Sequence, residues 1–363
     1  MVSSGLSFGR FPVFVALRDI RFAKGRFALM GAVVTLITTL VVFLYGLTGG
    51  LSSAASSTIA ELPVDGVVFG APAGAEPEVS FASSTVTADQ QAKVAAAAGT
   101  KDAHPLGVAM TRLTAPGGAA SVSVLGTDAA LLPPLSAGAA PKDGEVAVGA
   151  DTAKEYRLSP GSQVSLGAEK LTVSAVTAER SLSHAPSVWT TPATWQQVSG
   201  QKQPTAVAVH GTPKDLPSDL KAIARGDALA GINGYSAERG SLQMIQGFLF
   251  AVSALVVGAF FTVWTVQRRP DIAVLKAVGA SSGYLVRDAL AQAAAVLVAG
   301  SLLGGAIGAV GGAFASAAVP FDVGVLTVAV PVGAMVVLGL LGAALAVRRI
   351  TAVDPLAALG ANR

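Results

Sequence analysis

The chain is divided by its hydrophobic pattern into apolar stretches and one long polar segment. Four stretches contain no Asp, Glu, Lys or Arg, and each exceeds the roughly 20 helical residues that cross ~30 Å of hydrocarbon. They are Ala28–Leu51, Ser241–Gln267, Ala289–Phe321 and Val323–Val347. We therefore predict an α-helical membrane protein with four transmembrane helices, at 28–51, 241–267, 285–319 and 323–347.

The segment between the first two predicted spans, 52–240, is rich in Ala, Ser, Thr, Pro and Gly, and its apolar runs have the length of strands. We expect one mixed α/β domain there, inserted between helices 1 and 2 and lying outside the cytoplasm. Alternating positions predict five strands, at Ser121–Leu125, Glu145–Val148, Gln163–Leu166, Lys170–Val176 and Thr205–Val209. Two short helices are predicted at Thr87–Ala98 and Asp151–Tyr156.

The charges indicate which side of the membrane each segment occupies. The segments before span 1, between spans 2 and 3, and after span 4 hold twelve Lys or Arg against four Asp. The inserted segment holds thirteen basic and seventeen acidic residues. Because basic residues near spans stay in the cytoplasm, both termini are expected inside a plasma membrane.

Composition narrows the function classes further. The chain is 52% hydrophobic and 13% charged, which a soluble globule of this size would not show. No nucleic-acid partner is expected, since the basic residues flank the spans and form no patch with interleaved aromatics. There is no cysteine, so the inserted domain must fold without disulfides. We expect no metal site, because the histidines His104, His184 and His210 lack ligand spacing and are predicted in loops or at strand ends.

The two ends of the chain carry basic residues beside the membrane. Segment 1–27 places apolar residues near helical spacing between basic ones, which predicts either an amphipathic helix on the inner membrane surface or the plain basic flank of span 1. Segment 348–363 is predicted to be a cytoplasmic tail.

The segment between spans 2 and 3, Arg268 to Ser281, reads RRPDIAVLKAVGAS. This order resembles the signature that follows the second span in the FtsX/MacB-type permease family of ABC transporters. An ordinary basic hairpin would explain the arginines but not the rest of the order. The tail, with Asp354-Pro355 after a basic pair, and the segment Glu145 to Leu166 also resemble this family.

The resemblance implies that 268–284 is a coupling helix that contacts a separate ATPase subunit. The residues that match the family motif are Arg268, Arg269, Asp271, Ile272, Leu275, Lys276 and Gly279. The chain has no G-x-x-x-x-G-K-[ST] loop to cradle phosphates, so it is not expected to be an enzyme, and ATP-Mg would bind the partner. Family members act as dimers, which implies two copies of this chain with two ATPase subunits.

The third span carries Gly300, Gly304, Gly308 and Gly312 at a spacing of four, which places them on one helix face. Small residues at this spacing let membrane helices approach closely, so we interpret the face as a packing surface.

The compact chain and its first span resemble the haem-exporting HrtB-like branch and the DevC-like branch. Haem, as a substrate, would need an apolar cleft and a ligand side chain, for which the candidates are Tyr45, Glu61, Tyr235 and Met244. Each also has an ordinary interpretation: Tyr45 as an interfacial residue, Met244 as a lipid-facing or packing residue, and Glu61 and Tyr235 as surface residues. No intrinsic cofactor is expected.

Three other functions stay open from the sequence. The chain could be an FtsX-like transmitter that regulates an extracytoplasmic cell-wall hydrolase, or a permease for lipoproteins, lipids or peptides. A membrane enzyme or receptor would need a polar constellation that the sequence does not display. The charge-free stretches argue against an ion or proton route.

Overall fold

A computed structural model describes residues 24–72, 74–268, 274 and 278–351. The chain divides into two compact units, of which one contains residues up to Gly50 together with those from Leu242 onward, and the other is Leu51–Ser241. The described residues do not include Arg269, Asp271, Ile272, Leu275 and Lys276 of the predicted coupling helix, nor most of segment 1–27 and of the tail.

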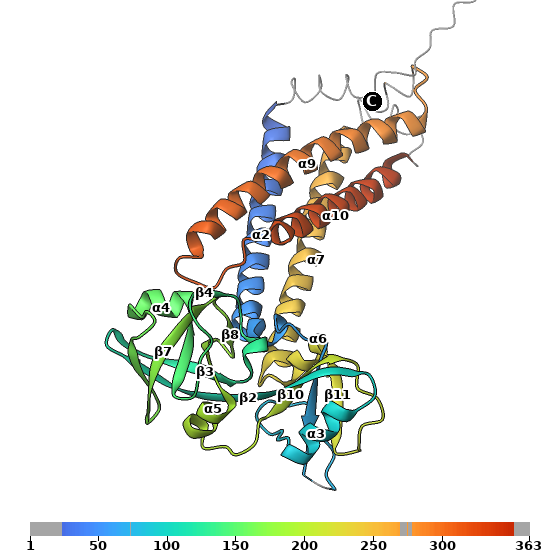
Figure 1. Cartoon of the computed structure of the whole chain (residues 1–363). Coiled ribbons are helices and arrows are strands. Elements are labelled where there is room, and N and C mark those ends of the chain that lie inside the picture. Colours follow the sequence, from blue (N-terminus) through green and yellow to red (C-terminus); the bar gives the residue numbers. More distant parts are fainter. Residues whose placement is uncertain (1–23, 73, 269–273, 275–277, 352–363) are drawn as a thin grey trace, which may run out of the picture. The chain divides into compact units, whose positions relative to one another are not determined.

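Four helices among the described residues are long and apolar enough to cross a membrane. They are α2 (Lys24–Ala60), α7 (Tyr235–Gln267), α9 (Ser282–Ala315) and α10 (Val325–Thr351), shown in Figure 1. Their apolar faces form a shared core that includes Val34, Phe261, Trp264, Leu297 and Met335. The predicted fold class, four transmembrane helices with a mixed α/β domain between the first and second, is confirmed.

The helix boundaries differ from the expected spans. Helix α2 continues nine residues past Leu51, because Ala55 and Ile59 in its last turns are buried in the core of the inserted domain. Helix α9 begins at Ser282, after Ser281 accepts a hydrogen bond from the Tyr284 amide, and its first turns carry Arg287 and Asp288. The positions of charged residues do not reveal these helix ends, because a capping residue determines the start of α9 and contacts with the inserted domain determine the end of α2.

The inserted domain contains eleven strands in the described part of the chain. The strands are β1 (Gly66–Gly70), β2 (Thr100–Ala115), β3 (Gly118–Gly126), β4 (Leu135–Gly138), β5 (Glu145–Gly149), β6 (Gln163–Leu166), β7 (Glu169–Thr177), β8 (Ser181–Leu182), β9 (Ala185–Thr190), β10 (Ala206–Gly211) and β11 (Leu220–Ala224). The short helices are α3 (Ala88–Ala96), α4 (Ala150–Tyr156), α5 (Pro192–Ser199) and α6 (Arg225–Ala228), with 3₁₀ turns η1 (Ala129–Leu131) and η2 (Leu229–Gly231).

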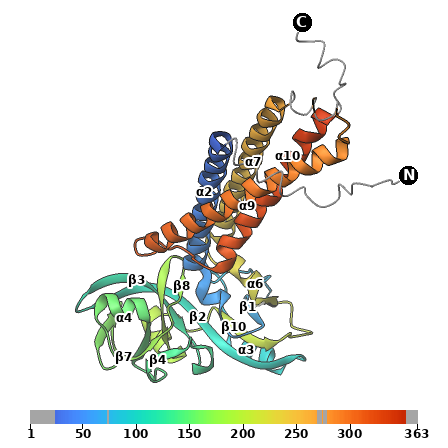
Figure 2. The ribbon, with the colours of Figure 1, turned by 90° about the horizontal axis from the view of Figure 1, so that it is seen from above.

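The strand order along the main path is β11-β1-β10-β2-β3-β9-β5-β7-β4, with β6 paired to β2 and β7. Figure 2 shows the long strand β2 between β3 and β10. Most neighbours are antiparallel, whereas β3 with β9 and β5 with β7 are parallel pairs. The long strand β2 pairs with β10 through its first half and with β3 through its second half. It thereby joins a core around Phe69 and Trp189 to a second core around Leu113 and Trp195.

All five predicted strands and both predicted helices of this domain are present. Strand β7 alternates buried and partly exposed residues with the period of two that predicted it. Helix α3 begins with a capping box, in which Thr87 and Gln90 exchange side-chain hydrogen bonds with each other's backbone. The strands β1, β2, β4, β8, β9 and β11 were missed.

The prediction for His104 was wrong. It lies inside β2, where its ring is buried between Asp128, 3.0 Å from Nδ1, and Asp102, 3.0 Å from Nε2. Asp102 lies two positions earlier in the same strand and Asp128 follows β3, so the polar ring is buried with two partners.

Candidate functional site

The glycine face of α9 lies against α2. A Cβ at Gly300 would meet Val34, one at Gly304 would overlap the Thr35 carbonyl, and one at Gly308 would meet Val42. Gly312 instead faces the ring of Phe321, from the connection between α9 and α10. The absence of side chains at the first three positions lets the two helix backbones approach closely.

Threonine hydroxyls bridge the same two helices. Thr35 Oγ1 donates to the Gly300 carbonyl (3.2 Å) and Thr39 Oγ1 lies within hydrogen-bond distance of the Gly304 carbonyl (3.1 Å). Thr38 donates to Ser301 (3.4 Å), and both of these residues are fully buried. Hydrogen bonds of this kind hold helices together in apolar surroundings, so α2 and α9 form one packed pair.

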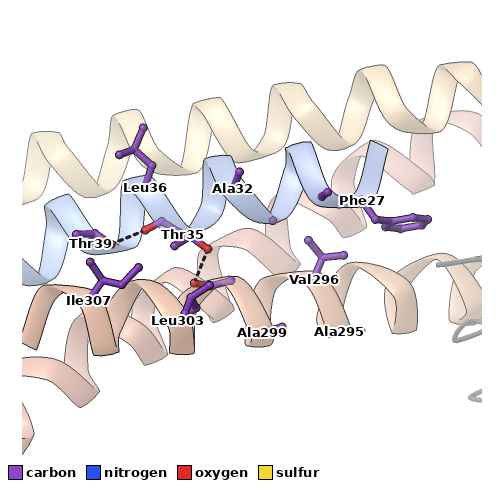
Figure 3. Close-up of a pocket in the computed structure, with 13 residues that line it drawn as sticks. Phe27, Ala32, Thr35, Leu36, Thr39, Ala295, Val296, Ala299, Leu303 and Ile307 are labelled. Atoms are coloured by element: carbon purple, nitrogen blue, oxygen red, sulfur yellow. Dashed lines mark hydrogen bonds between the residues drawn. The ribbon is translucent and has the colours of Figure 1, made fainter. Parts of the chain in front are cut away.

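An apolar groove of about 980 Å³ runs beside this helix contact. Its walls are formed by Phe27, Ala32 and Leu36 of α2 and by Ala299 and Leu303 of α9, which Figure 3 shows together with Thr35 and Thr39. No charged residue lines it among those described. A groove of this size and polarity suits a flat or flexible hydrophobic molecule.

The connection between α9 and α10 is fastened to α2. The Asp322 amide donates to the Gly46 carbonyl (3.0 Å), and the Phe321 ring lies 5.1 Å from that of Phe43. The Asp322 carboxylate accepts from the Gly324 amide (2.9 Å) and from the Thr327 hydroxyl (2.6 Å). These bonds satisfy donors at the start of α10.

Arg268, the first residue of the family motif, directly follows α7. Its Nη1 donates to Oε1 of the buried Gln292 (2.6 Å), and its guanidinium lies 5.1 Å from the centre of the Trp264 ring. Gln292 in turn donates to Asp288 (2.9 Å). The sequence interpretation missed Gln292, although a polar residue within a charge-free stretch is the signal that could have identified it.

Among the other described residues of this segment are Val274, Val278 and Gly279. Gly279 has φ of 100°, a left-handed backbone that favours glycine. Val274 and Val278 are exposed, at 62% and 83%. Exposed apolar side chains of this kind are available to a partner protein.

The four candidate ligand residues lie in different settings. Tyr45 is half-buried in α2, and Met244 is 64% exposed in α7. Glu61 follows α2 and pairs with Arg180, at 2.6 Å between carboxylate and guanidinium. Tyr235 is buried in the core of the inserted domain, where it packs with Ile59 and Ile232, and not on the surface as its ordinary interpretation held.

The inserted domain contains one half-buried carboxylate with a shifted pKa, that of Glu179. Burial raises the pKa of Glu179, while hydrogen bonds from the amides of Asp151 and Thr152 at the start of α4 lower it to a smaller extent. The group acts as a remote cap of α4. Among the described residues, no group of three or more His, Asp or Glu is arranged to hold a metal ion.

Two family models match most of this chain. Residues 27–227 match the model of the MacB-like periplasmic core domain, and residues 244–355 match that of the FtsX-like permease C-terminal domain. The periplasmic region of MacB from Actinobacillus actinomycetemcomitans aligns with 46% of this chain and 92% of its own at 10% identity, with a TM-score of 0.36.

Several relatives match over nearly the whole chain. An ABC transporter permease of Mycobacterium tuberculosis is 28% identical over 363 residues, covering 96% of this chain and 99% of the relative. A relative from Staphylococcus haemolyticus, whose name assigns it to a hemin transport system as permease protein HrtB, is 26% identical over 355 residues, covering 95% and 99%. The chain belongs to the MacB/FtsX-type family of ABC transporter permeases, plasma-membrane proteins with an extracytoplasmic domain that work with an ATPase subunit.

Proposed function

We propose that this permease exports haem or a similar hydrophobic amphiphile, with ATP hydrolysed by a separate subunit. The observation that carries the proposal is the match to the HrtB relative over nearly the full length of both chains. The uncharged groove of about 980 Å³ between α2 and α9 supports it, because haem and other amphiphiles carry a large apolar surface.

The proposed assembly has two copies of this chain and two ATPase subunits, with both termini in the cytoplasm and no intrinsic cofactor. The motif around Arg268 would receive the ATPase, and the Arg268–Gln292–Asp288 bonds would transmit its motion to α7 and α9. The proposed roles of Arg269, Asp271, Ile272, Leu275 and Lys276 rest on the family motif alone.

Among the ligand candidates, Tyr45 and Met244 are the ones to test for haem. Both lie on membrane helices and are at least partly exposed. Tyr235 is less suited because its side chain is buried in the core of the extracytoplasmic domain. Glu61 is less suited because its carboxylate forms an ion pair with Arg180.

The test uses the permease co-purified with its ATPase subunit in lipid nanodiscs. Haem is titrated while the Soret band and ATP hydrolysis are followed, with Tyr45→Phe and Met244→Leu compared against Met110→Leu, an exposed residue of β2. A saturable Soret shift with altered ATPase activity, lost in a membrane-helix variant but kept in the control, would support haem export. A stable complex whose ATPase activity and spectra do not change with added haem would rule out haem as the exported molecule.

The same complex separates the alternative functions. Activation by a phospholipid, lipoprotein or peptide would assign a different cargo. Stable binding of a cell-wall hydrolase to the extracytoplasmic domain, with no cargo moved, would favour a transmitter.

A further inference from the structure

A second pocket lies wholly within the extracytoplasmic domain, with a volume of about 460 Å³. Its walls come from three separate segments: the end of α2 with the residues after it, η1 with the residues after it, and strand β9 with Arg180 before β8. The apolar part includes Leu131, Leu132, Pro134 and Trp189, while Glu61 and Arg180 are the charged residues that line it. The pocket therefore combines an apolar lining with a single ion pair.

The two charges differ in their exposure to water. The Arg180 side chain is 19% exposed, whereas the Glu61 side chain is 49% exposed. The Glu61 carboxylate can therefore turn toward water at lower cost than the guanidinium can, since a charge that leaves a partner must be solvated again.

Arg180 also retains hydrogen-bonding capacity. Its Nη1 donates to the Glu179 carbonyl (2.7 Å), and its Nη2 lies 2.6 Å from Glu61. A guanidinium has five N–H donors in a planar fork that matches a carboxylate. The remaining N–H donors of Arg180 have no hydrogen-bond acceptor among the described residues, so the guanidinium can donate to a second carboxylate.

Trp189 forms a buried part of the apolar lining, since it is 1% exposed and lines the pocket. Its Nε1–H has no hydrogen-bond partner in the described part of the chain. The same is true of Trp195, which does not line the pocket, so Trp189 contributes apolar surface and not a sign of a missing polar group.

We propose that this pocket binds an amphiphile with a carboxylate head group. The Arg180 guanidinium binds the carboxylate, and apolar lining residues such as Leu131 and Trp189 contact the apolar body. Glu61 then competes with the ligand for Arg180, because its carboxylate forms an ion pair with the guanidinium when the pocket is empty. The site is separate from the α2–α9 groove, and its existence does not depend on haem being the exported molecule.

The probe is 11-bromoundecanoate, added to the full chain in nanodiscs. The sequence has three tryptophans, so a Trp195→Phe/Trp264→Phe background leaves Trp189 as the reporter that bromine quenches. The matched probes are 11-bromoundecanol and 11-bromoundecyltrimethylammonium, which keep the chain and change the head. Native mass spectrometry of the chain with all tryptophans present, with the same three probes, counts bound molecules independently of the Phe substitutions.

We expect saturable quenching by the carboxylate probe and at least about tenfold weaker binding of the alcohol, because hydrogen bonds to charged groups are the stronger ones. Arg180→Gln should weaken carboxylate binding by at least about tenfold. Glu61→Gln should strengthen it, since the competitor loses its charge. Glu78→Gln, at an exposed carboxylate away from the pocket lining, should change nothing.

Three results would overturn the proposal. They are non-saturable quenching that is equal for all three heads, preference for the trimethylammonium probe, and weaker carboxylate binding in Glu61→Gln. None of these would bear on haem export, which is measured by the Soret band and ATP hydrolysis of the complex.

Discussion

Phe321, in the connection between α9 and α10, covers Gly46 of α2 so closely that a Cβ on Gly46 would overlap its ring. The same ring leaves no room for a side chain at Gly312 of α9. One aromatic side chain therefore joins the end of the helix hairpin to the first membrane helix, at two glycines that are 266 positions apart in the chain.

Replacing Gly46 with alanine should displace Phe321 and destabilise this unit by about 1–3 kcal/mol, the usual cost of adding a methyl group to a packed site. Reversible unfolding in mixed micelles measures the change in free energy. Gly333→Ala in α10 is the matched control, because a Cβ there meets no atom within 4 Å. Equal effects of the two substitutions would show that the Phe321 contact is not important for stability.

The contact between α2 and α9 predicts a difference between two glycines of one helix. Gly304→Ala should destabilise the helix pair by about 1–3 kcal/mol, because its Cβ would overlap the Thr35 carbonyl and approach Thr38. Gly311→Ala, whose Cβ meets nothing within 4 Å, should be neutral or slightly stabilising. The same unfolding assay compares them, and equal losses would contradict a close approach at Gly304.

Removing the amide of Gln292 should reduce communication with the ATPase. Gln292→Leu deletes the acceptor of Arg268 and the donor to Asp288, and a hydrogen bond to a charged group contributes about 1.5–3 kcal/mol. We expect cargo-stimulated ATP hydrolysis by the complex to fall while the basal rate is kept. Gln243→Leu, an exposed position near the other end of α7, is the control. If cargo stimulates ATP hydrolysis equally in Gln292→Leu and the original chain, Gln292 does not contribute to coupling.

The half-buried Glu179 predicts a pH dependence of the stability of the extracytoplasmic domain. Because burial raises its folded-state pKa above the unfolded value, the folded state binds the proton more tightly, and stability from this group is greatest below the unfolded pKa. That contribution is lost as pH rises through the folded pKa. Relative to Glu179→Gln, which does not titrate, the original chain should lose stability as pH rises through this window.

Hydrogen exchange of the segment 145–156 in the full chain, followed by mass spectrometry at several pH values, measures this difference. Glu155→Gln, which changes an exposed carboxylate of α4, is the control. If the original chain instead gained stability relative to the Glu179 variant as pH rises, the hydrogen bonds from the α4 amides would outweigh the effect of burial on this carboxylate.

The sequence by itself determined the four membrane helices, because a charge in hydrocarbon is costly and charge-free stretches of that length are rare elsewhere. It determined the strands in which burial alternates with period two, such as β7. The order of residues around Arg268 also sufficed for the family, which the matched domains confirmed. The small residues on one face of α9 indicated a packing surface, although not its partner.

Only the tertiary structure decided which distant residues meet. Strand β2 was missed because it is long and serves two cores, so its burial does not follow a simple alternation. The pairs Glu61–Arg180, Phe321–Gly46 and Arg268–Gln292 join residues whose local sequence contains no sign of the other partner. Tyr235 was expected at the surface because a polar ring beside a span suits the interface, yet packing against Ile59 and Ile232 buries it. Periodicity reports which face of an element is buried, whereas the folded chain alone selects what covers that face.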